Sequence, residues 1–211
     1  MKKNFIYIIS GPSGTGKSSV INKILKSKLI SNIKLSISYT TRLMRETEKN
    51  KINYFFISKK KFKKMISKNI FLEYEKIFGN YYGTSIYFVN KCLKEKNDVF
   101  LEIDWKGANQ IRKKYPDITK SILILPPSIK ELHSRLKKRE KNKILEEKRI
   151  NDYFKIIKYY KHYDYLIVNK VIEISINKIK EIVYSIRNKS NKLALKSDKN
   201  EHLIKKLING Y

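Results

Sequence analysis

The sequence predicts an α/β fold, in which a mostly parallel sheet forms the middle of a three-layer core. Short apolar runs alternate with amphipathic segments of helical length, which is typical of a parallel sheet covered on both faces. A glycine-rich loop follows the first apolar run and precedes the first helical segment. The length of 211 residues suits one sizeable domain with insertions. We therefore expect a single core that carries smaller inserted segments.

Four continuous apolar runs are predicted to be strands of the core. They are rich in β-branched and aliphatic residues and occupy residues 5–10, 99–103, 121–125 and 165–168. Apolar residues at helical spacing predict helices at residues 18–29, 85–96, 106–114, 128–139 and 174–186. The start of the helix at 128–139 is the best defined, because Ser128 and Glu131 form a capping box after two prolines.

Two internal segments interrupt the alternation of strands and helices. Residues 37–82 are rich in Tyr, Phe and Thr, with alternating patterns at 53–57 and 71–77 around a helix at 59–66. They predict a small, mixed α+β insertion. Residues 137–148 are almost all charged and predict an exposed, mobile flap. Near the end of the chain, a polar linker at 188–200 and a short helix at 202–207 are expected.

The composition excludes several classes of protein. A hydrophobic fraction of 41% with 12% aromatic residues is enough for a real core, which excludes wholesale disorder. A single cysteine, Cys92, excludes a disulfide framework, and three scattered histidines make a histidine-rich metal site unexpected. The apolar runs fall far short of the ~18 residues that span a bilayer. We expect a cytoplasmic protein without a membrane segment.

The formal net charge is +29, from 48 basic and 19 acidic residues. Only seven of the basic residues are arginine, and the lysines are spread along the whole chain rather than concentrated in one segment. Nucleic-acid surfaces usually concentrate their charge and combine it with aromatic or arginine side chains. We therefore expect no dedicated nucleic-acid function, although the charge favours anionic ligands such as phosphorylated small molecules.

The most specific motif lies between the first strand and the first helix. It fits G-x-x-x-x-G-K-[ST], and its residues are Gly11, Pro12, Ser13, Gly14, Thr15, Gly16, Lys17 and Ser18. Glycines allow backbone N–H groups to surround a phosphate, and the following helix N-terminus adds a favourable dipole. Lys17 would contact the β- and γ-phosphates, and the Ser18 hydroxyl would bind Mg²⁺. The motif predicts a nucleoside triphosphate site on a P-loop core.

Acidic and basic side chains elsewhere are weaker candidates. Glu102 and Asp104 lie at the C-terminal end of a buried strand, where α/β sheets place groups that face ligands. Arg42 and Arg45 form a pair suited to phosphate, with solvated loop residues as the alternative. Three further arginines border the charged flap: Arg135, Arg139 and Arg149. Either they close over a transferred phosphoryl group, or they lie on a solvated helix face.

Together these segments closely resemble the guanylate kinase family. The resemblance rests on SGPSGTGKSS, on SISYTTR with Arg45 three residues later, on FLEYEKIFGNYYGTS and on FLEIDWKG. It runs in order over residues 5–169 and more loosely to the C-terminus. The set is specific, because other nucleoside monophosphate kinases lack the combination of GNYYGTS, S-x-T-T-R and the phosphate loop.

The resemblance implies a role for each matching residue. The GMP phosphate would be held by Arg42, Arg45, Tyr54 and Tyr82, and guanine would be read by Ser38, Glu73, Thr84 and Asp104. ATP would be bound by the phosphate loop with Ser19 and Asn169, and Ser18 and Glu102 would face Mg²⁺, directly or through water. Lys17, Arg42 and the three flap arginines would be catalytic.

The resemblance also implies a division of the chain. Residues 1–34, 85–126 and 153–190 would form the core, 35–84 the GMP-binding insertion, and 127–152 a helical lid over ATP. Residues 191–211 would form a flexible linker and a C-terminal helix. The chain departs from the family pattern at Glu102, Lys106, Glu140 and Lys170, and the lid is one residue shorter. These departures concern the lid and the adenine edge more than GMP recognition.

The expected reaction is ATP + GMP ⇌ ADP + GDP, with Mg²⁺ as cofactor and dGMP as a further acceptor. Two alternatives belong to other classes. A non-catalytic guanylate-kinase-like binding module would not require the intact Lys17 and Ser18. A nucleic-acid-dependent P-loop ATPase would account for the charge, but it would need a nucleotide-sensing motif that is not found. The sequence leaves the oligomeric state open.

Overall fold

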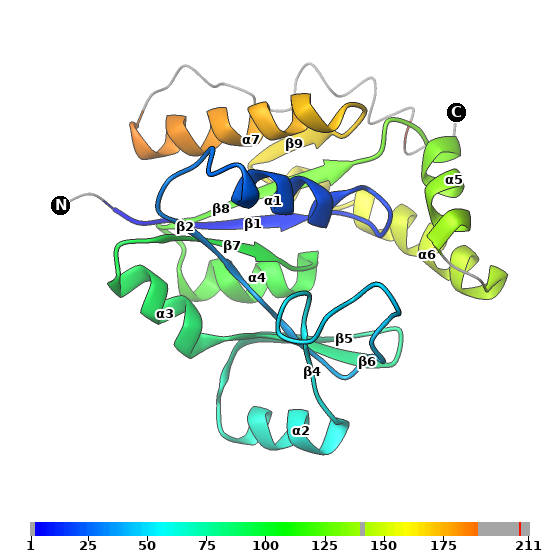
Figure 1. Ribbon diagram of the computed structural model, residues 1–211, viewed down its shortest axis with the longest axis horizontal. Helices are drawn as coiled ribbons and strands as arrows, with labels where there is room; N and C mark the ends of the chain where they lie inside the picture. Colours follow the sequence, from blue (N-terminus) through cyan, green and yellow to red (C-terminus); the bar gives the residue numbers. More distant parts are fainter. Residues whose placement is uncertain (1–2, 140–141, 190–206, 208–211) are drawn as a thin grey trace. The chain divides into compact units, whose positions relative to one another are not determined.

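The computed structural model describes residues 3–139, 142–189 and 207, and it contains two sheets (Figure 1). A five-stranded sheet has the order β2-β7-β1-β8-β9, and a four-stranded sheet has the order β4-β3-β6-β5. The strands are β1 (Ile6–Ser10), β2 (Ile33–Ser36), β3 (Tyr39–Thr40), β4 (Phe55–Phe56), β5 (Phe71–Ile77), β6 (Asn80–Ser85), β7 (Asp98–Glu102), β8 (Thr119–Leu125) and β9 (Tyr165–Val168). The helices are α1 (Lys17–Lys26), α2 (Lys59–Ser67), α3 (Ile86–Lys94), α4 (Trp105–Lys114), α5 (Ile129–Arg139), α6 (Lys143–Ile157) and α7 (Ile172–Arg187), with a 3₁₀ turn at Tyr160–His162.

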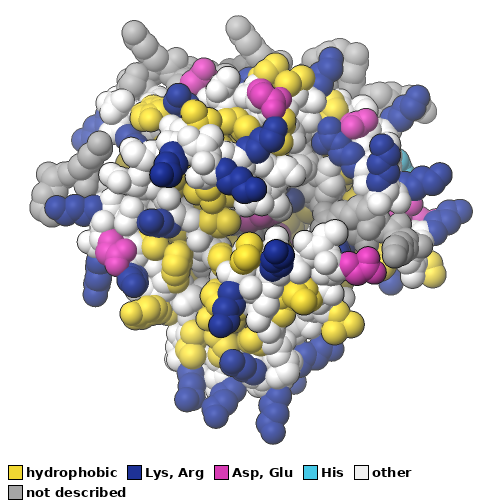
Figure 2. Space-filling model, in the orientation of Figure 1, with side chains coloured by type: hydrophobic (Ala, Val, Ile, Leu, Met, Phe, Trp, Pro, Cys, Tyr) yellow, Lys and Arg dark blue, Asp and Glu magenta, His cyan; other side chains and the backbone are white. Residues whose placement is uncertain are grey.

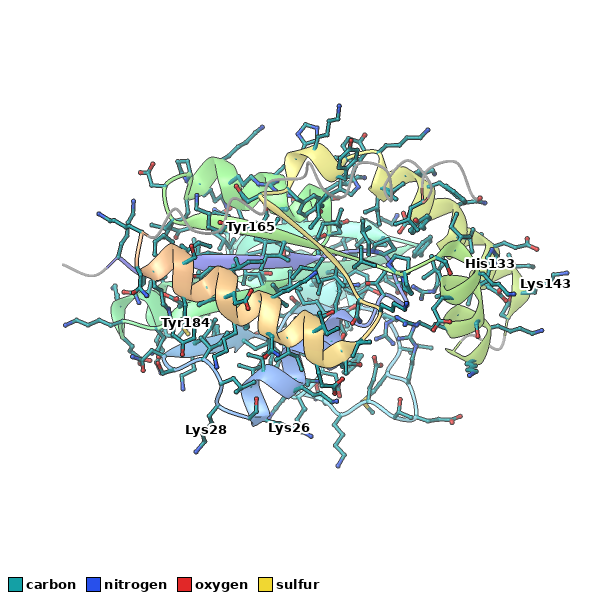
Figure 3. The ribbon with its side chains drawn as sticks, turned by 90° about the horizontal axis from the view of Figure 1, so that it is seen from above. Lys26, Lys28, His133, Lys143, Tyr165 and Tyr184 are labelled. Atoms are coloured by element: carbon teal, nitrogen blue, oxygen red, sulfur yellow. The ribbon has the colours of Figure 1, made fainter. Side chains whose placement is uncertain are left out.

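The chain forms two compact units, which are described separately. The first contains residues 1–3, 9–31 and 120–211, and the second contains residues 4–8 and 32–119. In the first unit, β8 and β9 pair in parallel and α1 packs against α7. Helix α1 buries Val20, Ile21 and Ile24, which lie on one face at helical spacing. The solvent side of this unit carries lysines, and Lys26 and Lys28 point away from the ribbon (Figure 3).

The second unit combines a parallel strand pair with the whole of the small sheet. Strands β2 and β7 pair in parallel, and α3 packs beside them. Strands β5 and β6 form an antiparallel hairpin, and β3 joins β6 on its other side. Helix α2 covers this sheet through Phe62, whose ring stacks on Phe71 and Tyr81 at centroid distances of 4.4 and 5.3 Å. The small sheet therefore has its own aromatic core.

The predicted fold class is confirmed: the large sheet is mostly parallel, and the inserted sheet is mixed. All four predicted core strands and all five predicted core helices are present, with ends that shift by a few residues. The Ser128 cap is also found, since its Oγ accepts the Glu131 N–H at 3.1 Å. The proposed division into core, insertion and lid stays a prediction.

The structure adds elements that the sequence patterns did not predict. Strand β2 was missed, and α6 runs to Ile157, beyond the predicted end of the lid. Where the charged flap was expected, residues 137–139 continue α5 and residues 143–148 begin α6, so both ends are helical. Residues 140 and 141, with most of the predicted C-terminal linker and helix, lie outside the described residues. Leu207 is described and buried, and its carbonyl oxygen accepts the Tyr153 hydroxyl at 3.3 Å.

Candidate active site

The phosphate loop lies between β1 and α1 in the first unit, as the motif predicts. The Thr15 hydroxyl and the Lys17 ammonium group both donate to the Pro12 carbonyl oxygen, each at 2.9 Å. Gly16 precedes α1 with a φ of 88°, which is in the left-handed region that glycine adopts without strain. Ser18 and Ser19 are exposed in the first turn of α1. The loop thus keeps the shape of a phosphate cradle through its own hydrogen bonds.

Asn169, just after β9, contacts the phosphate loop with its side chain. Its Nδ2 donates to the Thr15 carbonyl oxygen at 2.8 Å, and its Oδ1 accepts the Ser175 hydroxyl at 2.9 Å. A Cβ atom on Gly16 would overlap the Asn169 amide nitrogen. The side chain is 5% exposed and supports the loop from within the protein. Its predicted contact with ATP stays a prediction.

Two of the three predicted flap arginines lie beside this loop. Arg149 on α6 donates from Nη1 to the Ser13 hydroxyl at 2.7 Å. Arg135 on α5 donates from Nε to Glu131 at 2.9 Å and from Nη2 to the Asn169 carbonyl oxygen at 3.4 Å. The side chain of Arg139, at the end of α5, and the whole of Glu140 lie outside the described residues. The structure therefore brings Arg149 to the phosphate loop, and Arg135 to Asn169, which supports that loop.

Helices α5 and α6, which carry these arginines, also contact each other. His133 Nδ1 on α5 lies 3.4 Å from Glu146 Oε1 on α6. His133 is labelled in Figure 3, where Lys143, at the start of α6, points outward from the fold. The Asn142 side chain caps α6, because its Oδ1 accepts the N–H groups of Ile144 and Leu145. This pair of helices thus places arginines at the loop and lysines in solvent.

The paired arginines of the second unit share one carboxylate, that of Glu48. Glu48 Oε1 lies 2.7 Å from Arg42 Nη2 and 3.6 Å from Arg45 Nη1, while Oε2 accepts the Arg45 backbone N–H at 2.9 Å. Burial alone would raise the pKa of Glu48, but the hydrogen bond and charge of Arg42 lower it. The shared anion holds the two guanidinium groups together, which is the arrangement that a phosphate-binding pair needs.

Tyr54 and Tyr82 lie next to this pair. Their rings meet edge to face with centroids 6.0 Å apart, and the Arg42 guanidinium carbon lies 5.6 Å from the Tyr54 ring centre. Burial is the main cause that raises the pKa of Tyr54, and the Glu102 charge adds to it. The Tyr54 hydroxyl therefore stays protonated at neutral pH and is able to donate to a phosphate oxygen.

Glu73 on β5 is the most deeply buried carboxylate of the predicted guanine site. It is 4% exposed, and its Oε1 accepts the Thr84 hydroxyl from the neighbouring strand β6 at 2.6 Å. Burial raises its pKa to about 7, against the Thr84 hydrogen bond and with help from the Asp104 charge. Asp104 caps α4 by accepting the Gly107 N–H at 2.9 Å. The structure thus brings Glu73, Thr84 and Asp104 into one cluster.

The remaining predicted residues lie at strand ends of the second unit. Ser38 is 8% exposed between β2 and β3, and its carbonyl oxygen accepts the Phe55 N–H at 2.9 Å. Glu102 is half-buried at the end of β7. Within the described residues, no three His, Cys, Asp or Glu side chains gather in a way that would hold a metal ion. In the same part of the chain, no helix has the length and apolar character needed to cross a bilayer.

Sequence reasoning missed three residues that support these sites: Glu48, Gly107 and Ser175. Glu48 follows Arg45 by three residues, and this charge pattern was a usable signal. Gly107 and Ser175 lie inside helices, and their importance comes from contacts with residues distant in the sequence, Glu73 and Asn169. Local patterns carry no signal for such contacts.

Comparison with known proteins agrees with this site. The protein-family model described as "Guanylate kinase" matches residues 3–186. The chain is 46% identical over 211 residues to the guanylate kinase of Buchnera aphidicola from Schizaphis graminum, covering 99% of each chain. It is 43% identical over 197 residues to that of Vibrio cholerae, covering 93% of this chain and 95% of the relative.

A solved structure agrees as well. The crystal structure of guanylate kinase from Anaplasma phagocytophilum superposes with a TM-score of 0.76 and 29% identity, covering 90% of this chain and 89% of that one. The family match and the full-length relatives extend over the phosphate loop, the arginine pair and the Glu73 cluster alike. The chain therefore belongs to the guanylate kinase family.

Proposed function

We propose that the chain catalyses ATP + GMP ⇌ ADP + GDP with the residues described above. The bond between the γ-phosphorus of ATP and its bridging oxygen breaks, while a phosphate oxygen of GMP bonds to that phosphorus. The observation that carries this function is the buried Glu73 carboxylate, which shares the second unit with the Arg42–Glu48–Arg45 cluster. Together they offer one group for a guanine base and one for its phosphate.

Glu73 accounts for the choice of guanine. Guanine presents its N1–H and its exocyclic amino group side by side, and an ionised carboxylate accepts both hydrogen bonds. Adenine has no such donor pair, so AMP would offer the buried carboxylate neither of these two hydrogen bonds and would bind poorly. Thr84 holds one carboxylate oxygen from the side, which fixes the plane of the group. Ser38 and Asp104 are proposed as further base contacts from their positions in the family pattern.

Arg42 and Arg45 would bind the GMP phosphate, with Tyr54 and Tyr82 beside them. The arginine forks match phosphate oxygens in pairs, and they already face a carboxylate of similar shape in Glu48. The acceptor oxygen of GMP is ionised before it attacks, so the step requires no general base. Catalysis then consists of aligning the two reactants and balancing their charge.

The donor nucleotide would bind in the first unit. The phosphate loop and the N-terminus of α1 would surround the β- and γ-phosphates, with Lys17 as their counter-charge. Arg135 and Arg149, which contact Asn169 and Ser13, would stabilise the charge on the transferred phosphoryl group. Arg139 is proposed for the same role from its position in the family pattern.

Magnesium would enter this site with ATP. Mg²⁺ usually takes one or two protein oxygens and completes its shell with phosphates and water. The exposed Ser18 hydroxyl in the first turn of α1 fits that pattern, since it needs no cluster of protein carboxylates. When bound, the ion would neutralise charge on the phosphates. The role of Glu102 towards the ion, and the use of dGMP, stay predictions.

A coupled assay of ADP formation tests the function. GMP, AMP and single-stranded DNA are each added to the protein with ATP and Mg²⁺. We expect turnover with GMP, and no more than a trace with the other two. Stimulation by DNA, or equal turnover with AMP, would contradict the proposal.

Glu73→Gln tests the assignment of the guanine site. A glutamine amide has one accepting and one donating end, so it meets one guanine donor with a donor of its own. We expect kcat/KM for GMP to fall by about two orders of magnitude, since a lost charge-assisted bond and a new mismatch together cost about 3 kcal/mol. Binding of ATP, measured by calorimetry, should change less than twofold. Equal loss for both nucleotides would show that the base site lies elsewhere.

A further inference from the structure

Gly107, the third residue of α4, lies directly against the Glu73 carboxylate. A Cβ atom built on Gly107 would overlap Glu73 Oε2 and would lie 3.1 Å from its carboxyl carbon. Gly107 is itself buried, and its N–H donates to Asp104 at the start of the helix. The position without a side chain therefore faces the group that is proposed to read guanine.

The backbone does not require glycine at this position. Gly107 is helical and is absent from the glycines with a positive φ, which in the described residues are Gly11, Gly14, Gly16 and Gly79. Inside a helix, glycine is less favourable than alanine, because it loses more backbone freedom on folding. The fold alone would thus be better served by alanine. What glycine provides here is space for a carboxylate oxygen.

Glu73 and Gly107 are fixed in position relative to each other. On one side of Glu73, Lys114 Nζ donates to the Leu72 carbonyl oxygen at 2.5 Å. On the other side, the Gln110 amide meets the Tyr74 backbone twice, accepting its N–H at 3.3 Å and donating to its carbonyl oxygen at 3.1 Å. Helix α4 is therefore attached to β5 on both sides of Glu73, and it cannot easily withdraw.

The carboxylate itself has little freedom. Its Oε1 is held by the Thr84 hydroxyl, and Glu73 is paired with Thr84 across the β5–β6 ladder. Its Oε2 points toward α4 and has the space above Gly107. If that space were filled, the carboxylate would have to rotate, because the end of a side chain moves more easily than two attached backbones.

We propose that Gly107 is a specificity-determining positioning residue: its missing side chain allows Glu73 to hold the plane in which both carboxylate oxygens accept from guanine. This rests on the proposed guanine site. A methyl group at this position would turn the carboxylate and break at least one of the two charge-assisted hydrogen bonds. The loss of one such bond corresponds to about a tenfold to hundredfold weaker binding.

Gly107→Ala tests the proposal, with Asn109→Ala as the matched control. Asn109 is exposed on the same helix, so its replacement changes helix propensity without reaching Glu73. Binding of guanosine, GMP and an ATP analogue is measured by calorimetry, and the melting temperature is measured for each protein. Gly107→Ala should weaken the binding of guanosine and of GMP about tenfold to hundredfold. It should change the affinity for the ATP analogue by less than twofold.

The outcomes separate the possible failures. Guanosine and GMP binding as strong as in the wild type would overturn the role of Gly107. A lower melting temperature together with weaker binding of the ATP analogue would also overturn it, because the effect would then be a general loss of structure. If the wild type itself shows no turnover with GMP, the proposed function fails rather than this inference. Asn109→Ala should match the wild type in its binding of all three ligands, whatever its melting temperature.

Discussion

Glu73 is held in surroundings that favour its neutral form, although its proposed task needs the ionised form. Burial raises its pKa to about 7, so the carboxyl group changes charge close to neutral pH. The two guanine donors would favour ionisation, because they replace the water that burial removes. Binding of guanine would therefore be coupled to loss of the proton from Glu73.

Guanosine binding should therefore depend on pH. With a pKa of about 7, the ionised fraction of Glu73 rises from about a tenth at pH 6 to about nine-tenths at pH 8. We expect the dissociation constant of guanosine to fall about tenfold over this range, as measured by calorimetry. Guanosine is used because it lacks the phosphate of GMP, which titrates near pH 6. A flat profile for guanosine would contradict the expectation.

The same ionisation has a matching effect on folding. A raised pKa in the folded state gives stability that is present below the unfolded value of 4.5 and is lost as pH rises through about 7. In Glu73→Gln this loss of stability does not occur, because glutamine does not ionise. Its free energy of unfolding should thus exceed that of the wild type above pH 7 by up to about 3 kcal/mol, and the difference should disappear at low pH.

At the scale of single elements, the charges on the surface of α2 are unfavourable for the helix. Its lysines cover every face that does not pack on the sheet, and no acidic residue occurs between Glu48 and Glu73. Figure 2 shows Lys and Arg side chains gathered over α2, at the bottom of the view. Lys59, Lys60 and Lys61 occupy the first turn, where the helix dipole is positive. The helix forms because Phe62 and Met65 pack on the sheet, and it does so against its own electrostatics.

Lys61→Glu should stabilise the protein. Ser58 already caps α2 by accepting the Lys61 N–H at 3.2 Å, and glutamate at 61 would complete a capping box. It would also remove repulsion between neighbouring lysines, and its negative charge would interact favourably with the positive end of the helix dipole. We expect an increase of about 1 kcal/mol in the free energy of unfolding in urea, shrinking as salt is added. Lys64→Glu changes the net charge equally at the other end of the helix, so a gain as large there would disprove the capping explanation.

Some elements could be predicted from the sequence and others could not. The P-loop, the alternating core and the arginine pair are encoded in local patterns, so they were predicted. Strand β2 was not, because Lys34 is exposed and only Ile33 and Ser36 of its four residues are buried. The local patterns did not predict helix α6, because its first half is charged and its buried side chains begin at Ile150; only the family resemblance implied a helical lid there. Gly107 acts on Glu73, which only the folded chain brings near, so no local pattern announced it.

At the scale of the molecule, the residues proposed to bind ATP lie in one unit, and those proposed to bind GMP lie in the other. The phosphate loop, Arg135, Arg149 and Asn169 belong to the first unit, while Arg42, Arg45, Glu73 and Asp104 belong to the second. Each set is fixed by hydrogen bonds within its own unit, such as Arg149 to Ser13 and Thr84 to Glu73. Each set of residues therefore has its own structural support.

Hydrogen exchange should show this separation. GMP alone is expected to slow amide exchange around residues 42–48 and 71–84, because it would tie down the groups that bind its phosphate and base. A non-hydrolysable ATP analogue alone should slow exchange in residues 11–19 and around Asn169. Mass spectrometry of peptic fragments measures both effects. Equal protection of both regions by either nucleotide would contradict the assignment.

The hydrogen bonds that Lys17 and Thr15 make to the Pro12 carbonyl oxygen have a kinetic consequence. A loop that is held in shape by hydrogen bonds among its own residues does not depend on GMP before it accepts ATP. The Glu48 carboxylate does the same for the arginine pair, so neither reactant must arrive first. The enzyme is thus expected to follow a random sequential scheme, in which GDP competes with GMP, and ADP with ATP.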